Sequence, residues 1–268
     1  MASCRYRASI RPMQSFQCPQ CGVRSALAGD RETPACSLCG ANARYCGIIL
    51  AVLDVAFGGS RLPLIQQEPR NDIVAIGVSD SACYSDMMSQ RLQYRNTFFH
   101  TEPLLDICDP ASCAGYAPVD LIVCSDVIEH TADPPHVILA NLHSMLRPGG
   151  WAVLSAPTWR MQSSIEWYPA AAELRIVTGP SGYAVEWCNR RGARYVDHYP
   201  NFHGGPGETL ERRLLSHGEL MMAARHVFRE AHEQAFEPER GYEWPMQPWP
   251  DPVVGFSEID SRIIVLRR

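Results

Sequence analysis

Four cysteines near the start of the chain have the spacing of metal ligands. They form two Cys-x-x-Cys pairs separated by fourteen residues, Cys18 with Cys21 and Cys36 with Cys39. Each pair can direct two thiolates at one ion from a tight turn, and four thiolates complete the tetrahedral shell of a structural zinc site. Gly22 and Gly40 follow the two pairs, where such turns favour a permissive residue. The spacing therefore predicts a Zn²⁺ site with these four ligands.

Other uses of these cysteines stay open. The thiols could be free, or one pair could be redox-active, although a redox pair has no need of a duplicate. Cys4 and Cys46 are alternative ligands. Because a shell of four thiolates leaves no open coordination position, we expect a zinc ion that stabilises the fold and takes no part in catalysis.

A second group of polar side chains follows an apolar run in the middle of the chain. Residues 119–124 are apolar apart from one aspartate, and Ser125, Asp126, Glu129 and His130 come directly after them. Ligands of α/β proteins bind at the carboxyl ends of parallel strands. The pattern therefore predicts a ligand site in the loop after residue 124.

The loop after residues 73–76 is a candidate for the same edge of a sheet. This apolar run ends at Gly77, and Ser79 and Asp80 follow it. One glycine is a weak sign of a nucleotide-binding loop, because a plain turn needs the same residue. Its place after a buried strand makes this loop a candidate.

The elements that would position these loops alternate between strand and helix. We expect helices over 48–56, 81–92 with Asp80 as N-cap, from Asp133 up to the Pro-Gly-Gly at 148–150, and 216–227. The expected strands are 73–76, 96–100, 104–107, 119–124, 151–155, 228–236 and 263–266, and residues 63–72 read as a connector. Alternation with short connections predicts a parallel-rich α/β sheet covered on both faces.

Length and composition agree with one large domain or a medium domain with a small appendage. The chain has 268 residues, of which 46% are hydrophobic, and a formal net charge of −5. An acidic chain is a poor default partner for nucleic acid. The start of the chain has basic residues without an apolar stretch, and the apolar segment 47–57 is too short to span a bilayer. We therefore expect a cytoplasmic protein with reduced thiols and no membrane partner.

The order and spacing of several motifs resemble class I S-adenosylmethionine-dependent methyltransferases, and in particular a subgroup with an N-terminal Cys-pair segment that ends in Cys-Gly-x-Asn-Ala-Arg. The motifs are, in chain order, residues 39–44, 76–80, 96–103, 119–130, 146–150, 155–157 and 202–211. The resemblance covers nearly the whole chain. It implies a Rossmann-like sheet of seven strands, the last antiparallel, with S-adenosylmethionine bound over the first, second and fourth strands.

The resemblance also implies a role for the loop after the first strand. Gly77 and Ser79 would line the methionine and ribose side of the cofactor, with Asp80 completing the loop. The family usually has an acidic-x-Gly-x-Gly-x-Gly pattern here, whereas this chain has Gly77, Ser79 and Ala82. S-adenosylmethionine has no pyrophosphate, so small side chains and close backbone approach matter more than three glycines.

Further cofactor contacts are implied at three other loops. A carboxylate after the second strand would accept the ribose hydroxyls, for which Glu102 is the candidate and His100 the alternative. Asp106 and Ile107 would contact the adenine, and Ser125 and Asp126 would lie near the methionine end. For each of these residues a solvated loop position is the alternative.

A hydroxyl acceptor would need a base, because alkoxide is scarce at neutral pH and histidine is the usual choice. His130 and His203 are the candidates, and His130 alternatively caps its loop. Asp126, Glu129 and His130 resemble positions that bind a divalent ion in some quinone O-methyltransferases, which gives a further alternative. Aromatic residues of the irregular segment could wall a substrate site or form a small core of their own: Trp159, Trp167, Tyr168, Tyr183 and Trp187.

The sequence thus predicts a zinc-binding module over 1–46 and a methyltransferase domain over 47–268, with residues 159–207 as a substrate-covering insert. We expect transfer of a methyl group to a small-molecule or glycan acceptor, most simply at a hydroxyl, and leave a homo-oligomer open. One alternative is a ribosomal RNA methyltransferase whose module, with six arginines in 1–46, reads RNA. Another is a non-catalytic protein that keeps the scaffold.

Overall fold

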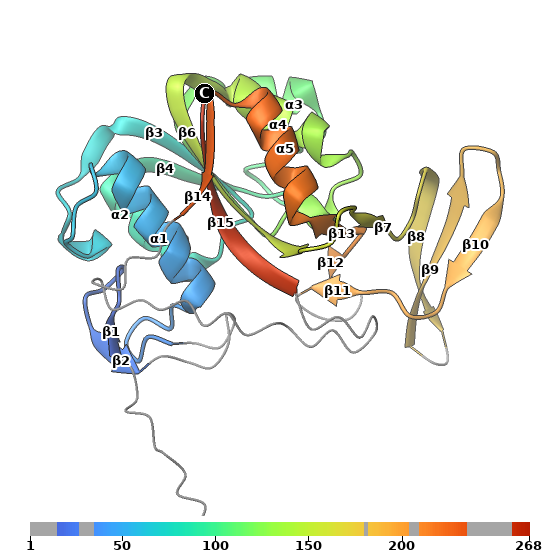
Figure 1. Cartoon of the computed structure of the whole chain (residues 1–268), viewed down its shortest axis with the longest axis horizontal. Helices are drawn as coiled ribbons and strands as arrows, with labels where there is room; N and C mark the ends of the chain where they lie inside the picture. The colour runs from blue at the N-terminus through green and yellow to red at the C-terminus, as the bar shows by residue number, and fades with distance from the viewer. Residues whose placement is uncertain (1–14, 27–34, 180–181, 204–208, 235–258) are drawn as a thin grey trace, which may run out of the picture.

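The computed structural model describes residues 15–26, 35–179, 182–203, 209–234 and 259–268. Its centre is a twisted sheet with strand order β14-β15-β6-β5-β3-β4, to which two short strands, β13 and β7, are added beside β6 (Figure 1). The bounds are β3 Arg70–Val78, β4 Leu92–Thr97, β5 Val119–Ser125, β6 Leu146–Trp159, β7 Ile165–Glu166, β13 Arg213–Ser216, β14 Glu230–Glu233 and β15 Ile259–Arg267.

The direction of the strands confirms the predicted fold class. The pairs β3–β4, β3–β5 and β5–β6 are parallel, whereas β15, the last strand, is antiparallel to both β6 and β14. This is a Rossmann-like, mostly parallel sheet with an antiparallel last strand. The carboxyl ends of β3, β4 and β5 therefore lie at one edge, where Gly77 pairs in register with Asn96 and with Val123.

Helices cover both faces of the sheet (Figure 1). The helices are α1 Ala43–Ala56, α2 Ala82–Arg91, α3 Pro110–Ala114, α4 Pro135–Met145 and α5 His217–Val227, with short 3₁₀ turns at Leu64–Gln66 and Ile128–His130. Leu121 and Val123 of β5 join the core under α1 and α2, whereas Ile122 and Cys124 join the core under α4 and α5. Because successive strand residues face opposite sides, a strand buried on both faces is apolar throughout, as the sequence is here.

Two predicted elements have different ends or forms. Residues 104–107, predicted as a strand, make only one bridge, between Phe98 and Leu104. The backbone there is used in a local loop, since Phe98 N–H donates to Pro103 O and Leu105 N–H donates to Phe98 O. The N-cap of α2 is Ser81 and not Asp80, because the Ser81 side chain accepts from Cys83 N–H.

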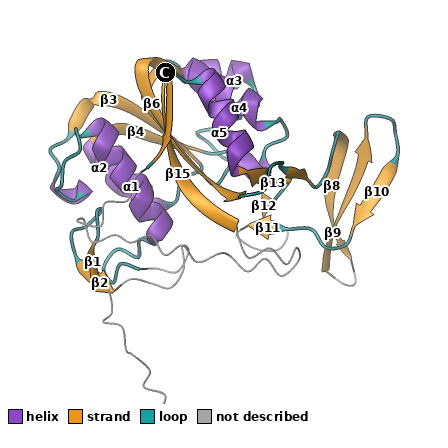
Figure 2. Ribbon diagram, viewed as in Figure 1, coloured by secondary structure: helices purple, strands orange, loops and turns teal. Residues whose placement is uncertain are grey.

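The insert contains a sheet that the sequence left ambiguous. Strands β8 Ala171–Gly179, β9 Gly182–Asn189 and β10 Arg194–Asp197 form an antiparallel sheet that stands beside the main sheet (Figure 2). The short strands β11 Phe202–His203 and β12 Thr209–Leu210 follow it. Tyr168, Val185 and Leu210 form a buried cluster there, against which Trp167 and Trp187 pack. These aromatic residues therefore build a small core of the insert.

The cysteine segment precedes the sheet and is attached to it. A hairpin of β1 Ser15–Gln17 and β2 Arg24–Ala26 leads to the second cysteine pair and then directly into α1. The predicted boundary between residues 46 and 47 lies inside α1, so the module and the larger domain share this helix. Within the described part of the chain, no helix combines the length and apolarity needed to cross a membrane.

Candidate active site and metal centre

The four predicted zinc ligands converge on one point. Their Sγ atoms all lie within 4.8 Å of one another. The Cys18 and Cys39 Sγ atoms are 3.6 Å apart, and those of Cys21 and Cys36 are 3.4 Å apart. Tetrahedral zinc with Zn–S bonds of about 2.3 Å separates its sulfur ligands by about 3.8 Å. The donor set therefore fits zinc, and among the described residues no other group of ligand atoms converges in this way.

Tight turns hold both pairs, as the glycines indicated. Gly22 N–H donates to Cys18 O at 2.8 Å, and Gly40 N–H donates to Cys36 O at 3.0 Å. Both glycines have positive φ angles, +82° and +72°, which favour glycine. Cys46 is fully buried beside the cluster but is not part of the converging set, and Cys4 lies outside the described residues.

The environment of the thiols differs from one cysteine to the next. Burial raises the pKa of Cys21 to about 11. At Cys36 burial acts in the same sense, but backbone N–H groups of Cys39 and Leu38 and the neighbouring thiols outweigh it and lower the pKa to about 6. Since zinc binds thiolates, metal binding must displace protons from the thiols with raised pKa values.

The loop after β3 is fastened to the end of β4. Ser79 N–H donates to Thr97 O at 2.7 Å, and Ser79 adopts a left-handed φ of 57°. The Asn96 side chain accepts from Asp80 N–H at 3.0 Å and donates to Asp80 O at 2.7 Å. These contacts bring the predicted residues 77–80 to the carboxyl end of β4, where a bound nucleoside would meet both loops.

Asp80 is buried at the centre of a tyrosine network. Tyr84 Oη donates to Asp80 Oδ1 at 2.6 Å, and Tyr94 Oη donates to Asp80 Oδ2 at 2.5 Å. Burial raises the pKa of Asp80 to about 7, although the two tyrosine hydrogen bonds and the charge of Arg44 oppose this shift. Asp80 thus fixes the start of α2 from inside, and the structure gives its carboxylate protein partners.

Gly77 is required by packing against this network. A Cβ atom at Gly77 would lie 1.8 Å from Tyr94 Oη and 2.5 Å from Asp80 Oδ2. The close approach predicted at this glycine is therefore made, on that side, by the protein's own Tyr94. The sequence suggested a small residue here but not the tyrosine that demands it.

The end of β5 carries a second polar network, and both residues predicted there belong to it. Ser155 Oγ donates to Asp126 Oδ1 at 2.7 Å and lies 2.9 Å from Ser125 Oγ. Arg44 Nη1 donates to Ser125 Oγ at 2.6 Å, and Arg44 Nε lies 3.4 Å from Asp126 Oδ2. Asp126 has a left-handed φ of 53°, so its position is set by backbone as well as by side-chain contacts.

The remaining predicted cofactor residues occupy the loop after β4. His100 and Glu102 are exposed, and Glu102 Oε2 accepts from Leu104 N–H at 3.0 Å. Asp106 Oδ1 accepts from Cys108 N–H at 2.8 Å, which turns the chain toward α3. Ile107 is buried. The contacts fix the shape of this loop at the carboxyl edge.

His130 lies in the 3₁₀ turn after β5. Its Nδ1 is 2.9 Å from Leu210 O, and its Nε2 is 3.6 Å from Oε1 of the buried Glu129. Asp126, Glu129 and His130 do not appear as a converging ligand group among the described residues, so the alternative of a divalent ion at this place is not borne out. The backbone of His203 lies in β11, but its side chain is outside the described residues.

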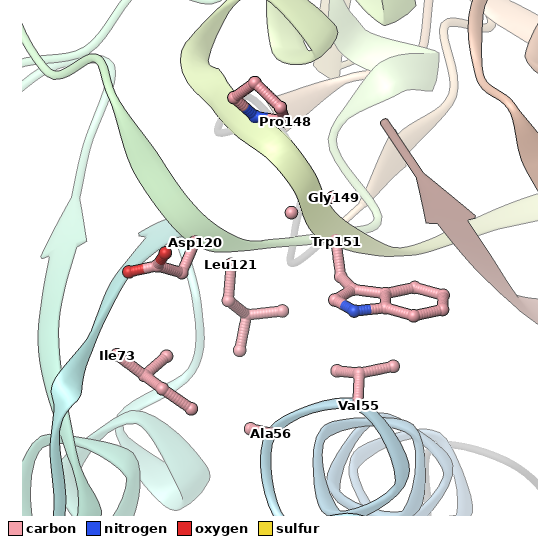
Figure 3. A pocket seen from close by; sticks show the side chains of 9 residues that line it. Val55, Ala56, Ile73, Asp120, Leu121, Pro148, Gly149 and Trp151 are labelled. Carbon is pink, nitrogen blue, oxygen red and sulfur yellow. The ribbon is translucent and has the colours of Figure 1, made fainter.

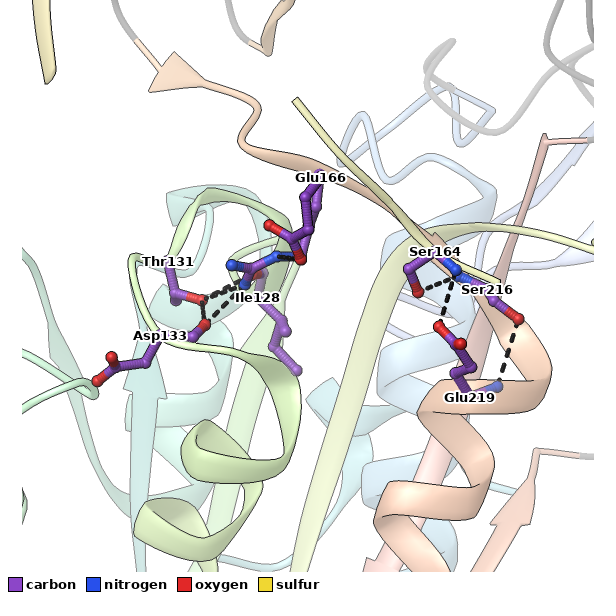
Figure 4. Close-up of polar contacts among 8 residues, drawn as sticks. Ile128, Thr131, Asp133, Ser164, Glu166, Ser216 and Glu219 are labelled. Atoms are coloured by element: carbon purple, nitrogen blue, oxygen red, sulfur yellow. Dashed lines mark hydrogen bonds and ion pairs between the residues drawn. The ribbon is translucent and has the colours of Figure 1, made fainter. Parts of the chain in front are cut away.

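A buried arginine ties the loop of His130 to the strands beyond β6 (Figure 4). The Arg213 guanidinium donates to Glu166 Oε1 at 2.8 Å, to Asp133 O at 2.7 Å and to Thr131 Oγ1 at 3.1 Å. Next to it, Ser216 Oγ accepts from Glu219 N–H at 3.3 Å. The Glu219 carboxylate accepts from Ser164 N–H at 2.7 Å, so half of the predicted capping box forms and the glutamate links α5 to the insert.

A cavity of about 140 Å³ lies at the opposite edge of the sheet (Figure 3). Val55 and Ala56 of α1 and Ile73, Leu121 and Trp151 of the sheet line it. These strand residues come at the beginning of β5 and near that of β3, whereas the polar networks follow the strand ends. The cavity is therefore separate from the candidate active site.

Sequence reasoning missed five residues of the two networks, which are Arg44, Tyr84, Tyr94, Asn96 and Ser155. Two of them lay inside motifs that carried the resemblance, Arg44 at the end of 39–44 and Ser155 at the start of 155–157. Tyr94 and Asn96 alternate along a strand whose burial was not visible in the sequence. Attention to polar residues within matched motifs would have found the first two.

Residues 59–196 match the model of a family described as a methyltransferase domain. The chain belongs to this family and is an S-adenosylmethionine-dependent enzyme of class I. No curated protein sequence matches the chain.

Solved structures with similar folds include three methyltransferases. For the 1,6-didemethyltoxoflavin-N1-methyltransferase of Burkholderia thailandensis, with bound 1,6-didemethyltoxoflavin and S-adenosylhomocysteine, the identity is 13% and the TM-score 0.41, over 84% of this chain and 78% of that one. For Streptomyces venezuelae DesVI the values are 10% and 0.40, over 82% and 90%. For the CurJ carbon methyltransferase they are 13% and 0.43, over 82% and 54%.

Proposed function

We propose that this enzyme transfers the methyl group of S-adenosylmethionine to a hydroxyl of a small-molecule or glycan acceptor. The observation that carries the choice of oxygen is the pair of His130 and Glu129 at the end of β5. Nδ1–H of His130 donates to Leu210 O, which leaves Nε2 as the proton acceptor. The buried Glu129 carboxylate, 3.6 Å from Nε2, would stabilise the imidazolium that forms when a hydroxyl gives up its proton.

The donor would lie along the carboxyl edge of β3, β4 and β5. In this proposal Gly77, Ser79 and Asp80 form the loop under the methionine and ribose, and Ser125 and Asp126 face the methionine end. The residues proposed for the loop after β4 are His100 and Glu102 toward the ribose hydroxyls, and Asp106 and Ile107 toward the adenine. The hydrogen bonds of Asn96 to Asp80 support a preformed edge. Methyl transfer gains most from a fixed line of donor and acceptor, so a rigid edge suits it.

The zinc ion would be structural. Cys18, Cys21, Cys36 and Cys39 would hold it, and four thiolates leave no position for substrate. Residues 1–46 would act as the metal module and 47–268 as the catalytic domain, with 159–207 as the insert that carries the second candidate base, His203. The ten described cysteines form no disulfide, which supports a reduced, cytoplasmic setting.

The RNA alternative loses part of its basis. It relied on arginines in the module, but Arg44 is directed inward to Ser125 and Asp126, and Arg24 is the other one in the described residues. RNA binding through phosphates would weaken steeply as salt is raised. Absence of such binding at low salt would leave the small-molecule or glycan acceptor.

The proposal is tested by incubating the zinc-loaded enzyme with S-adenosylmethionine and a panel of hydroxylated metabolites and sugars. Mass spectrometry should find a product with one added methyl group on oxygen, and His130→Gln should lower its rate by about 100-fold or more. As a control, His198→Gln, in an exposed part of the insert, should leave the rate unchanged. Methylation at nitrogen or carbon, or full activity of His130→Gln, would contradict the assignment to oxygen.

A further inference from the structure

Arg44 joins the cysteine module to the candidate active site. It is the second residue of α1 and its guanidinium reaches Ser125 and Asp126 at the end of β5. The Arg44 and Asp126 side chains are only 13% and 9% exposed. A pair this buried is costly to leave half-made, because either charge alone would remain without compensation. The place of Arg44 and the shape of the β5 end therefore depend on each other.

The start of α1 is in turn held by the second cysteine pair. Ala35 and Cys36 both donate their N–H groups to Ala41 O, at 3.1 and 3.0 Å. The Asn42 side chain then caps α1 by accepting from Tyr45 N–H. Only four residues separate Cys39 from Arg44. The turn that binds the metal thus sets where the helix begins and where Arg44 points.

The module also contacts the element that follows the loop 77–80. Gln20 Nε2 donates to Cys83 O at 2.6 Å, and Cys83 Sγ donates to Cys39 O at 3.3 Å. The rings of Tyr45 and Tyr84 are 5.0 Å apart, and Tyr84 holds Asp80. Both loops proposed for the donor therefore have a path of direct contacts to the metal ligands.

We propose that metal binding at the module and donor binding at the sheet edge are coupled, and that Arg44 is the positioning residue that carries this coupling. The inference rests on the proposed function, which places the methionine end of the donor at Ser125 and Asp126. Coupling between two binding equilibria is reciprocal, so a donor analogue must raise the affinity for the metal by the factor by which the metal raises the affinity for the analogue.

The test measures the zinc affinity of the full chain by competition with a chromogenic chelator, with and without saturating S-adenosylhomocysteine. In the wild type the analogue should raise the zinc affinity by about fivefold or more, the lower end of common coupling factors. In Arg44→Met the analogue should leave the zinc affinity unchanged. Arg44→Lys, which keeps the charge but loses the planar fork, should retain part of the effect and provides a second variant if Arg44→Met folds poorly.

Arg70→Met is the matched control, because Arg70 donates to Ala56 O at the other end of the same helix. It should keep the wild-type coupling. The inference is overturned if calorimetry finds the analogue bound while the zinc affinity stays constant, or if Arg44→Met and Arg44→Lys both show the full effect. Failure of the wild type to bind the analogue at all would instead reject the proposed donor site.

Discussion

Asp80 combines full burial with two hydrogen bonds, and this makes the pH dependence of stability a property of one residue. Its pKa is raised from 3.8 to about 7, with burial as the main cause. The native state therefore binds a proton more tightly than the unfolded chain between these values. The stabilisation is complete below about pH 4 and is lost as the pH rises through 7.

Replacement of Asp80 by Asn should remove this contribution. We expect the free energy of unfolding of the wild type, relative to Asp80→Asn, to fall between pH 4 and 7 by at most about 1.4 kcal/mol per pH unit. Urea unfolding at several pH values measures the difference, and Asp86→Asn, with a carboxylate outside the network, is the control. Parallel pH profiles of wild type and Asp80→Asn would contradict the role assigned to burial.

Gly77 gives a second prediction at this scale. Gly77→Ala would place Cβ 1.8 Å from Tyr94 Oη, so we expect it to destabilise the protein by about 1–3 kcal/mol or more, as overpacking does. The penalty should shrink in a Tyr94→Leu background, because the clash is then gone and the two changes are not additive. Gly218→Ala in α5, where the nearest atom is 3.8 Å away, is the control and should have little effect. Denaturant unfolding of the four variants checks this.

Elements were predictable from the sequence to the degree that their burial is two-sided. Strand β5 was visible because both faces are covered and its residues are almost all apolar. Residues 104–107 look like a strand in composition, but their backbone groups bond within the loop. The insert sheet was not predicted, because it buries few residues and its core consists of aromatic side chains contributed by separate strands. Ion-pair and tyrosine networks between elements leave no periodic sign at all.

The contact of Arg213 with the loop after β5 is such a connection between elements, and its removal should be costly. Arg213 is 3% exposed and donates to Glu166 and to two groups of residues 131–133. We expect Arg213→Met to lower the free energy of unfolding by about 3–5 kcal/mol, the range for breaking a buried pair. Hydrogen exchange over residues 128–133 should also become faster. Arg175→Met, which breaks an exposed pair with Glu186, should cost less than about 1 kcal/mol.

On the scale of the whole molecule, the cysteine pairs were the feature that the sequence gave away most completely. Spacing alone placed the four thiols, because two short turns suffice to bring them together. The way the module attaches to the sheet was not predictable, because it depends on contacts between residues far apart in the chain. Gln20 with Cys83 and Arg44 with Ser125 are examples, at separations of 63 and 81 residues.

This attachment predicts that loss of the metal destabilises more than the module. The purified chain should contain one zinc ion, and Cys36→Ser combined with Cys39→Ser should abolish it, as elemental analysis would show. Because α1 belongs to both the module and the core that covers β5 and β15, melting should shift to lower temperature for the whole sheet domain and not only for residues 15–42. Cys188→Ser, in the insert, should keep both the zinc and the melting temperature. A metal-free variant that melts like the wild type would mean that α1 is held in place by its apolar face alone, and the shared helix would then connect two independent units.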